Sequence, residues 1–95
     1  MNLNKMILLT IVAESVLKEE ILEGVLEVGA KGYTLTPVSG FGSRGNRQGP
    51  SGENIKVEIL CTPSVASAIQ TLVKRYESHY AMVAWEIEVA VNHEP

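Results

Sequence analysis

The sequence predicts a small α+β sandwich in which two β-α-β units are joined by a long loop. Apolar runs with the period of a strand alternate with stretches of helical period, in the order β-α-β-loop-β-α-β. The chain has 95 residues, which is enough for one domain and too few for two. Its composition, 45% hydrophobic and 20% charged, is typical of a globular protein and not of a disordered one.

The first unit is a strand, a helix and a second strand. Met6–Ala13 is a continuous apolar run, typical of a strand that is covered on both faces. The period then changes to that of an amphipathic helix, which we expect to have Ser15 as its N-cap and to end before Gly29. Tyr33–Ser39 is the second strand, and Pro37 places it at a sheet edge or at a bulge.

The second unit follows the loop. Ile55–Cys61 alternates apolar and polar residues, as a half-buried strand does. Pro63 suits the first position of a second helix, whose apolar stripe continues to Tyr76. After a short polar connection at 77–79, a last strand runs from Tyr80 to about Val91. This order predicts the ferredoxin-like βαββαβ sandwich, in which two helices back an antiparallel sheet.

Both faces of the predicted sheet are apolar. Alternate residues of the last strand share one face, and Trp85 on that face is expected to lie in the core or in a subunit interface. With this face packed on the helices, the opposite face is too apolar to stay exposed. The sequence therefore predicts self-association through a face that carries Ile7, Leu9, Ile11, Met82 and Ala84.

Residues 40–52 differ in composition from the rest of the chain. They hold five of the eight glycines, two of the three arginines and no acidic residue, in a chain of net charge −3. Gly40–Gly45 matches G-x-G-x-x-G, but a dinucleotide-binding turn needs a helix after it, and here a strand follows. Glycines let backbone N–H groups approach an anion, and Ser43, Arg44 and Arg47 are donors suited to phosphate. From the residues alone, a phosphate grip and a merely solvated loop are equally open.

The ionisable residues argue against several functions. All eleven acidic residues are Glu, so the usual Asp-based calcium and magnesium sites lack their ligand, and we expect no metal site. An acidic chain is a poor candidate for nucleic-acid binding. The glutamates of the first helix are spaced as a solvated face, and Cys61 is expected to be a buried, inert thiol. We therefore expect no enzyme, and a single Cys favours a reducing cytoplasm.

Four segments carry a resemblance to a known family: Ala30–Thr34, Gly40–Arg44 with Arg47, Glu53–Glu58 and Tyr76–Ala81. They are similar to the PII-like signalling proteins, and within them to the SbtB type, which regulates the bicarbonate transporter SbtA in the cyanobacterial CO2-concentrating mechanism. The resemblance extends from about Met6 to Val91. It implies a homotrimer that binds adenine nucleotides in clefts between subunits, with residues 40–54 as a T-loop. It also implies a cytoplasmic protein recruited to the inner face of the membrane through the transporter.

The resemblance implies a nucleotide site as well. Thr34 would contact the adenine, and Glu58, Met82 and Val83 would complete the pocket. Gly40, Phe41 and Gly42 would line the entrance, and Ser43, Arg44 and Arg47 would hold the phosphate. Nitrogen-regulatory PII proteins hold the β- and γ-phosphates with a loop that contains glycine and lysine, whereas residues 77–81 here contain neither. We therefore expect AMP or cyclic AMP, whose single phosphate suits two arginines, in preference to ADP or ATP, and no obligatory cofactor.

Two alternatives to transporter regulation stay open. One is a carboxysome-associated PII-like protein that senses ADP or AMP together with bicarbonate. The other is a weak nucleotide phosphohydrolase, in which bound ATP is hydrolysed near a glutamate. A sheet-face RNA binder of the same element order is discounted, because Ile55–Cys61 has no aromatic residue on which a base could stack.

Overall fold

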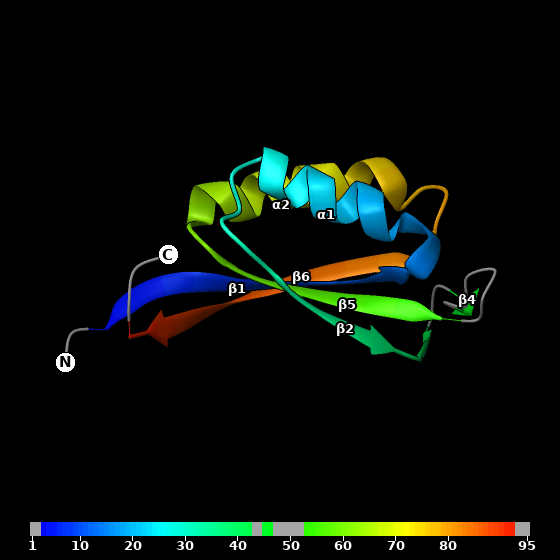
Figure 1. Ribbon diagram of the computed structural model, residues 1–95, viewed down its shortest axis with the longest axis horizontal. Helices are drawn as coiled ribbons and strands as arrows, with labels where there is room; N and C mark the ends of the chain where they lie inside the picture. Colours follow the sequence, from blue (N-terminus) through cyan, green and yellow to red (C-terminus); the bar gives the residue numbers. More distant parts are fainter. Residues whose placement is uncertain (1–2, 43–44, 47–52, 93–95) are drawn as a thin grey trace.

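The protein is a two-layer sandwich of one sheet and two helices (Figure 1). The computed structural model describes residues 3–42, 45–46 and 53–92. Its elements are β1 (Asn4–Glu14), a 3-10 turn (Ser15–Leu17), α1 (Lys18–Glu27), β2 (Thr34–Val38), β3 (Phe41–Gly42), β4 (Gly45–Asn46), β5 (Asn54–Cys61), α2 (Pro63–Tyr76) and β6 (Met82–Val91). The four long strands pair antiparallel in the order β2-β5-β1-β6, with both helices on one face. The predicted ferredoxin-like α+β fold is confirmed.

The segment between β2 and β5 contains more regular structure than the sequence predicted. The short strands β3 and β4 pair antiparallel, with Phe41 opposite Asn46, inside what was expected to be an irregular loop. The segment leaves and re-enters the sheet where Val38 of β2 lies opposite Asn54 of β5. β2 is an edge strand, as Pro37 predicted, because a proline lacks the N–H that a second neighbouring strand would need.

The core lies between the sheet and the helices. Leu9, Ile11 and Met82 are buried there, so the face that the sequence assigned to self-association is the face that packs on the helices. Trp85 and Ile87 lie on the opposite face and are 46% and 55% exposed. That assignment of the two faces was therefore wrong. Successive residues of a strand point to opposite faces of the sheet. β1 is apolar on both faces, so its sequence does not indicate which face meets the helices.

We call the face opposite the helices the open face, since no described element covers it. On β1, β5 and β6 it carries Leu8, Thr10, Val12, Lys56, Glu58, Leu60, Val83, Trp85 and Ile87. Several of these side chains are large and apolar. We therefore expect the association surface on the open face, and not on the face that packs on the helices.

The two helices begin differently. Ser15 is not the N-cap of α1, because residues 15–17 form a 3-10 turn and α1 begins at Lys18. α2 begins as predicted, with Pro63 as its first helical residue. Thr62 is its N-cap, and its Oγ1 accepts a hydrogen bond of 3.4 Å from the N–H of Val65.

α1 ends in a Schellman motif, which requires a left-handed residue. Gly29 has φ of 118°, its N–H donates to the carbonyl of Leu26 at 3.1 Å, and the N–H of Ala30 donates to the carbonyl of Val25 at 3.0 Å. The role of Gly29 as the residue after the helix is thereby confirmed. The turn directs the chain from α1 into β2.

Replacing Gly29 with alanine is expected to destabilise the protein. A side chain is strained at this φ, and its Cβ would also lie 3.2 Å from Cγ2 of Val65. We expect Gly29→Ala to lower the free energy of unfolding by about 1–2 kcal/mol in urea denaturation. The control is Gly32→Ala, whose Cβ would meet nothing within 4 Å. Equal stability of the two variants would contradict the turn described here.

Candidate functional site

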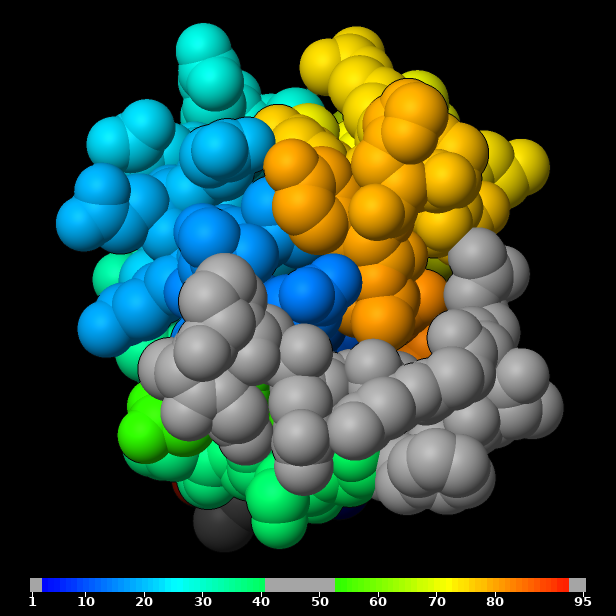
Figure 2. Space-filling model, turned by 90° about the vertical axis from the view of Figure 1, so that its right-hand side faces the viewer, coloured from blue at the N-terminus to red at the C-terminus, as the bar shows by residue number. Residues whose placement is uncertain are grey.

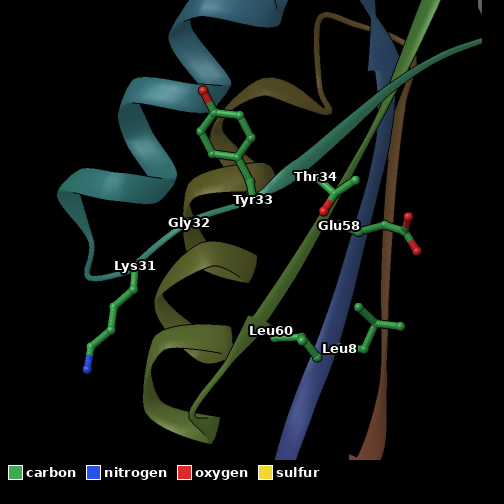
Figure 3. Close-up of a pocket in the computed structure, with 7 residues that line it drawn as sticks. All are labelled: Leu8, Lys31, Gly32, Tyr33, Thr34, Glu58 and Leu60. Carbon is green, nitrogen blue, oxygen red and sulfur yellow. The ribbon is translucent and has the colours of Figure 1, made fainter. Parts of the chain in front are cut away.

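A hollow of about 480 Å³ lies on the open face beside the start of β2 (Figure 3). Its walls come from three strands and from the chain segment that enters β2. The lining residues are Leu8 of β1, Lys31, Gly32 and Tyr33 before β2, Thr34 of β2, and Glu58 and Leu60 of β5. A volume of this size is within the range of small-molecule sites.

Strand register explains why these side chains meet. Thr34 lies opposite Glu58 across β2 and β5, and Leu8 lies opposite Leu60 across β1 and β5. Glu58 and Leu60 share a face because they are two residues apart on one strand. The hollow therefore has an apolar pair beside a polar pair. Such a surface suits a flat aromatic ring that carries a polar group on one edge.

The carboxylate of Glu58 has hydrogen-bonding capacity to spare. One of its oxygens lies 3.9 Å from Nζ of Lys56, and both side chains are about one-third exposed. An ion pair at that distance and exposure is weak. A carboxylate has about four acceptor positions, so a ligand can donate to Glu58 while Lys56 stays nearby.

Only part of the predicted site can be located among the described residues. Thr34 and Glu58 come together in the hollow. Val83 lies on the same face, but further along, opposite Val12. Met82 is 1% exposed and packs in the core below the helices, so its side chain does not reach the open face. A ligand contact from Met82 would have to be made by its backbone.

The residues predicted at the entrance lie within the described part of the chain, and those predicted at the phosphate lie outside it. Gly40 is exposed just after β2, and Phe41 and Gly42 form β3. Ser43, Arg44 and Arg47 lie outside the described residues, so their role stays a prediction. The loop joins β5 four residues before Glu58, a separation of about 13 Å along an extended strand.

Sequence reasoning missed the apolar floor of the hollow. Leu8 belongs to a run that is apolar throughout, so nothing in the sequence distinguishes it from its neighbours. Leu60 could have been found from the sequence. It shares a strand face with the polar residues Lys56 and Glu58, and an apolar residue is unusual on such a face. Leu60 is 42% exposed, so its side chain is accessible to a ligand.

The connection between α2 and β6 is attached to the end of β1. The N–H of Ala81 donates to Oε2 of Glu14 at 3.0 Å, and the N–H groups of His79 and Tyr80 both donate to the carbonyl of Tyr76 at 3.0 Å. Figure 2 looks onto this end of the molecule, where the connection (orange) lies against the end of β1 and the turn after it (blue). The connection is thus fixed beside the place where the loop meets the sheet.

Cys61 is buried, as predicted, and burial together with the charge of Glu86 raises the pKa of its thiol. A raised pKa disfavours the reactive thiolate. Within residues 3–42, 45–46 and 53–92, no group of three or more His, Cys or Glu side chains is placed to hold a metal ion. No helix in that part of the chain is long and apolar enough to span a membrane.

Sequence comparison assigns the family. Residues 6–93 match the sequence model of nitrogen regulatory protein P-II. The chain belongs to the P-II family. A PII-like signalling protein from Thermus thermophilus is 43% identical, with a TM-score of 0.83, and the match covers 96% of this chain and 93% of that one. The protein is therefore a PII-like signalling protein, as its sequence resemblance implied.

More distantly similar solved structures share the fold. CPII from Thiomonas intermedia, in a structure bound to ADP, AMP and acetate, is 20% identical with a TM-score of 0.88, covering 98% of this chain and 94% of that one. GlnK of B. subtilis, in complex with ATP, is 18% identical with a TM-score of 0.61, covering 87% and 82%. A comparison with curated proteins gave no significant match.

Proposed function

We propose that this P-II protein is a sensor of adenine nucleotides that works as a homotrimer and signals through its T-loop. The hollow formed by Thr34 and Glu58 beside Leu8 and Leu60 carries the proposal. An adenine ring can pack on the two leucines while its exocyclic amino group donates to the Glu58 carboxylate. Guanine presents a carbonyl oxygen at the corresponding position, which a carboxylate repels.

The open face supports the trimer. Leu60, Trp85 and Ile87 are between 42% and 55% exposed in the single chain. An apolar surface of this kind is typical of a protein interface. The hollow lies on the same face at the edge strand β2, so a neighbouring subunit packed on this face would turn it into a cleft between subunits.

The phosphate end of the nucleotide is assigned to the loop. Arg44 and Arg47 provide two guanidinium groups, and Ser43 provides a hydroxyl. Residues 77–81 contain neither glycine nor lysine with which to hold further phosphates. The proposed ligands are therefore AMP and cyclic AMP first, with ADP and ATP bound more weakly.

The proposed partner is a bicarbonate transporter of the SbtA type, contacted at the cytoplasmic face of the membrane by residues 40–54. Nucleotide binding would change the loop conformation and hence its fit to the transporter. The test is binding of the purified transporter in detergent, with and without AMP or cyclic AMP. Equal affinity under all conditions would refute nucleotide-controlled regulation.

A second candidate within the family is a sensor of ADP or AMP together with bicarbonate, associated with carboxysomes. It is favoured by the structure of the distantly related CPII in complex with ADP and bicarbonate. Bicarbonate that tightens ADP binding in titrations would support this candidate over the transporter regulator. The remaining alternative, a weak phosphohydrolase, predicts phosphate release from ATP that depends on a divalent metal, whereas a pure sensor releases none.

Replacing Glu58 with glutamine is expected to reduce the preference for adenine. A hydrogen bond to a charged group contributes about 1.5–3 kcal/mol, so we expect Glu58→Gln to weaken AMP binding at least tenfold. GMP binding should strengthen, because an amide can also donate to a carbonyl. The matched control is Glu88→Gln in β6, since Glu88 also pairs weakly with a lysine, Lys5, at 3.8 Å. An unchanged ratio of AMP to GMP affinity in Glu58→Gln would exclude Glu58 from base recognition.

A further inference from the structure

Several backbone donors of the connection between α2 and β6 are used within the chain itself. The N–H of Glu77 donates to the carbonyl of Val73 at 3.1 Å, and the N–H groups of His79 and Tyr80 both donate to the carbonyl of Tyr76 at 3.0 Å. A backbone segment holds phosphate through N–H groups that point toward the ligand and have no other partner. These three donors are therefore committed to the fold.

The N–H of Ala81, at the end of the same connection, has a different kind of partner. It donates to Oε2 of Glu14 at 3.0 Å, in a part-buried bond between residues 67 positions apart in the chain. The acceptor is a side-chain carboxylate, whereas the other three donors meet carbonyls of the backbone. A carboxylate is an anion that accepts from N–H groups, as a phosphate is. Glu14 thus occupies, with its own charge, a donor that an anionic ligand would otherwise use.

Glu14 lies at the end of the sheet to which the proposed phosphate end of the nucleotide is assigned. In the strand register it is opposite Asn54, the first residue of β5, and the N–H of Ser15 donates to the carbonyl of Glu53 at 3.3 Å. The end of β1, the start of β5 and the connection therefore meet at one end of the sheet, on the right in Figure 1. The proposed base hollow is four residues further along β5, at Glu58. A nucleotide with its base in the hollow and its phosphate at the loop brings any further phosphates toward Glu14.

We propose that Glu14 selects nucleotides with a single phosphate. Its carboxylate holds the N–H of Ala81 and repels the β- and γ-phosphates of ADP and ATP. AMP and cyclic AMP carry no phosphate beyond the one assigned to the loop, so this repulsion acts on them least. The inference rests on the proposed function and adds the residue that sets its ligand specificity. Glu14 is a positioning residue for the connection, and its charge discriminates between ligands.

Glu14→Gln tests the effect of the charge. The amide oxygen of glutamine can still accept from the N–H of Ala81, so the connection keeps its place while one negative charge is removed. Unit charges about 8 Å apart near a protein surface interact strongly enough to change a binding constant about tenfold after screening by salt. In calorimetry we therefore expect the affinity for ATP to rise about tenfold and the affinity for AMP to rise less than about threefold.

Two further variants separate charge from position. Glu14→Asp keeps the charge on a shorter side chain, and it should keep the wild-type ratio of ATP to AMP affinity. Glu86→Gln is the matched control, because Glu86 also accepts a hydrogen bond, from Nε2 of Gln70 at 3.2 Å. Glu86 lies opposite Leu9 on the face of the sheet that meets the helices, away from the loop. Its substitution removes the same charge and should leave the ratio unchanged.

The possible outcomes separate this inference from the proposed function. An unchanged ratio of ATP to AMP affinity in Glu14→Gln overturns the inference, as does an equal change in Glu14→Asp or Glu86→Gln. Loss of folding in Glu14→Gln also overturns it, because the carboxylate would then serve the fold and not the choice of ligand. A wild-type protein that binds ATP as tightly as AMP overturns the inference and leaves the nucleotide sensor intact. Failure of the wild-type protein to bind any adenine nucleotide overturns the proposed function, and the specificity with it.

Discussion

The double substitution Arg44→Ala/Arg47→Ala is expected to weaken the binding of AMP and cyclic AMP by about 100-fold or more. A hydrogen bond between a guanidinium group and phosphate contributes about 1.5–3 kcal/mol, and two arginines act on one phosphate. The thermal stability of the protein should change little, since the core described for this fold is built from other residues. Isothermal calorimetry gives the affinity, and thermal unfolding gives the stability.

The matched control for the two arginines is Lys74→Ala/Arg75→Ala. These residues are also a pair of cations, in the last turn of α2. Their removal changes the net charge by the same amount, so it reports any general loss of attraction for an anion. Equal weakening by the two double variants would show that the effect is one of net charge, and unchanged affinity in the loop variant would remove the phosphate grip from the mechanism.

Trp85→Glu is expected to break the proposed trimer. Trp85 lies on the open face opposite Thr10, and a carboxylate buried between two subunits without a partner strongly opposes association. We expect the mass in solution, measured by light scattering, to fall from three chains to one. Because the hollow lies on this face, nucleotide binding should weaken in the same variant.

Leu26→Glu provides the control for Trp85→Glu. Leu26 is also 46% exposed, but it lies on α1, away from the open face. This variant should keep the mass and the affinity of the wild-type protein. A Trp85→Glu variant that stays trimeric, or a Leu26→Glu variant that dissociates, would place the subunit interface elsewhere.

The sequence was sufficient for the fold because the local signals agree with one another. Strand and helix periods, Pro63 at a helix start, Pro37 at a sheet edge and Gly29 after a helix all indicate the arrangement observed. Features that depend on tertiary packing could not be obtained in this way. Ser15 had a side chain suited to an N-cap, but the chain leaves β1 through a tighter turn.

The candidate site was predictable only in part. Thr34 and Glu58 followed from the family resemblance, whereas Leu8 joins them through strand register, which no local pattern records. The burial of Met82 in the core follows from which sheet face meets the helices, and the sequence pattern left that undecided.

Calorimetric titration of the wild-type protein with AMP, cyclic AMP, ADP, ATP and GMP tests directly whether this P-II protein senses adenine nucleotides. We predict micromolar binding of AMP and cyclic AMP at one site per chain, weaker binding of ATP, and much weaker binding of GMP. No heat with any adenine nucleotide, or equal affinity for AMP and GMP, would contradict an adenine site at Thr34 and Glu58.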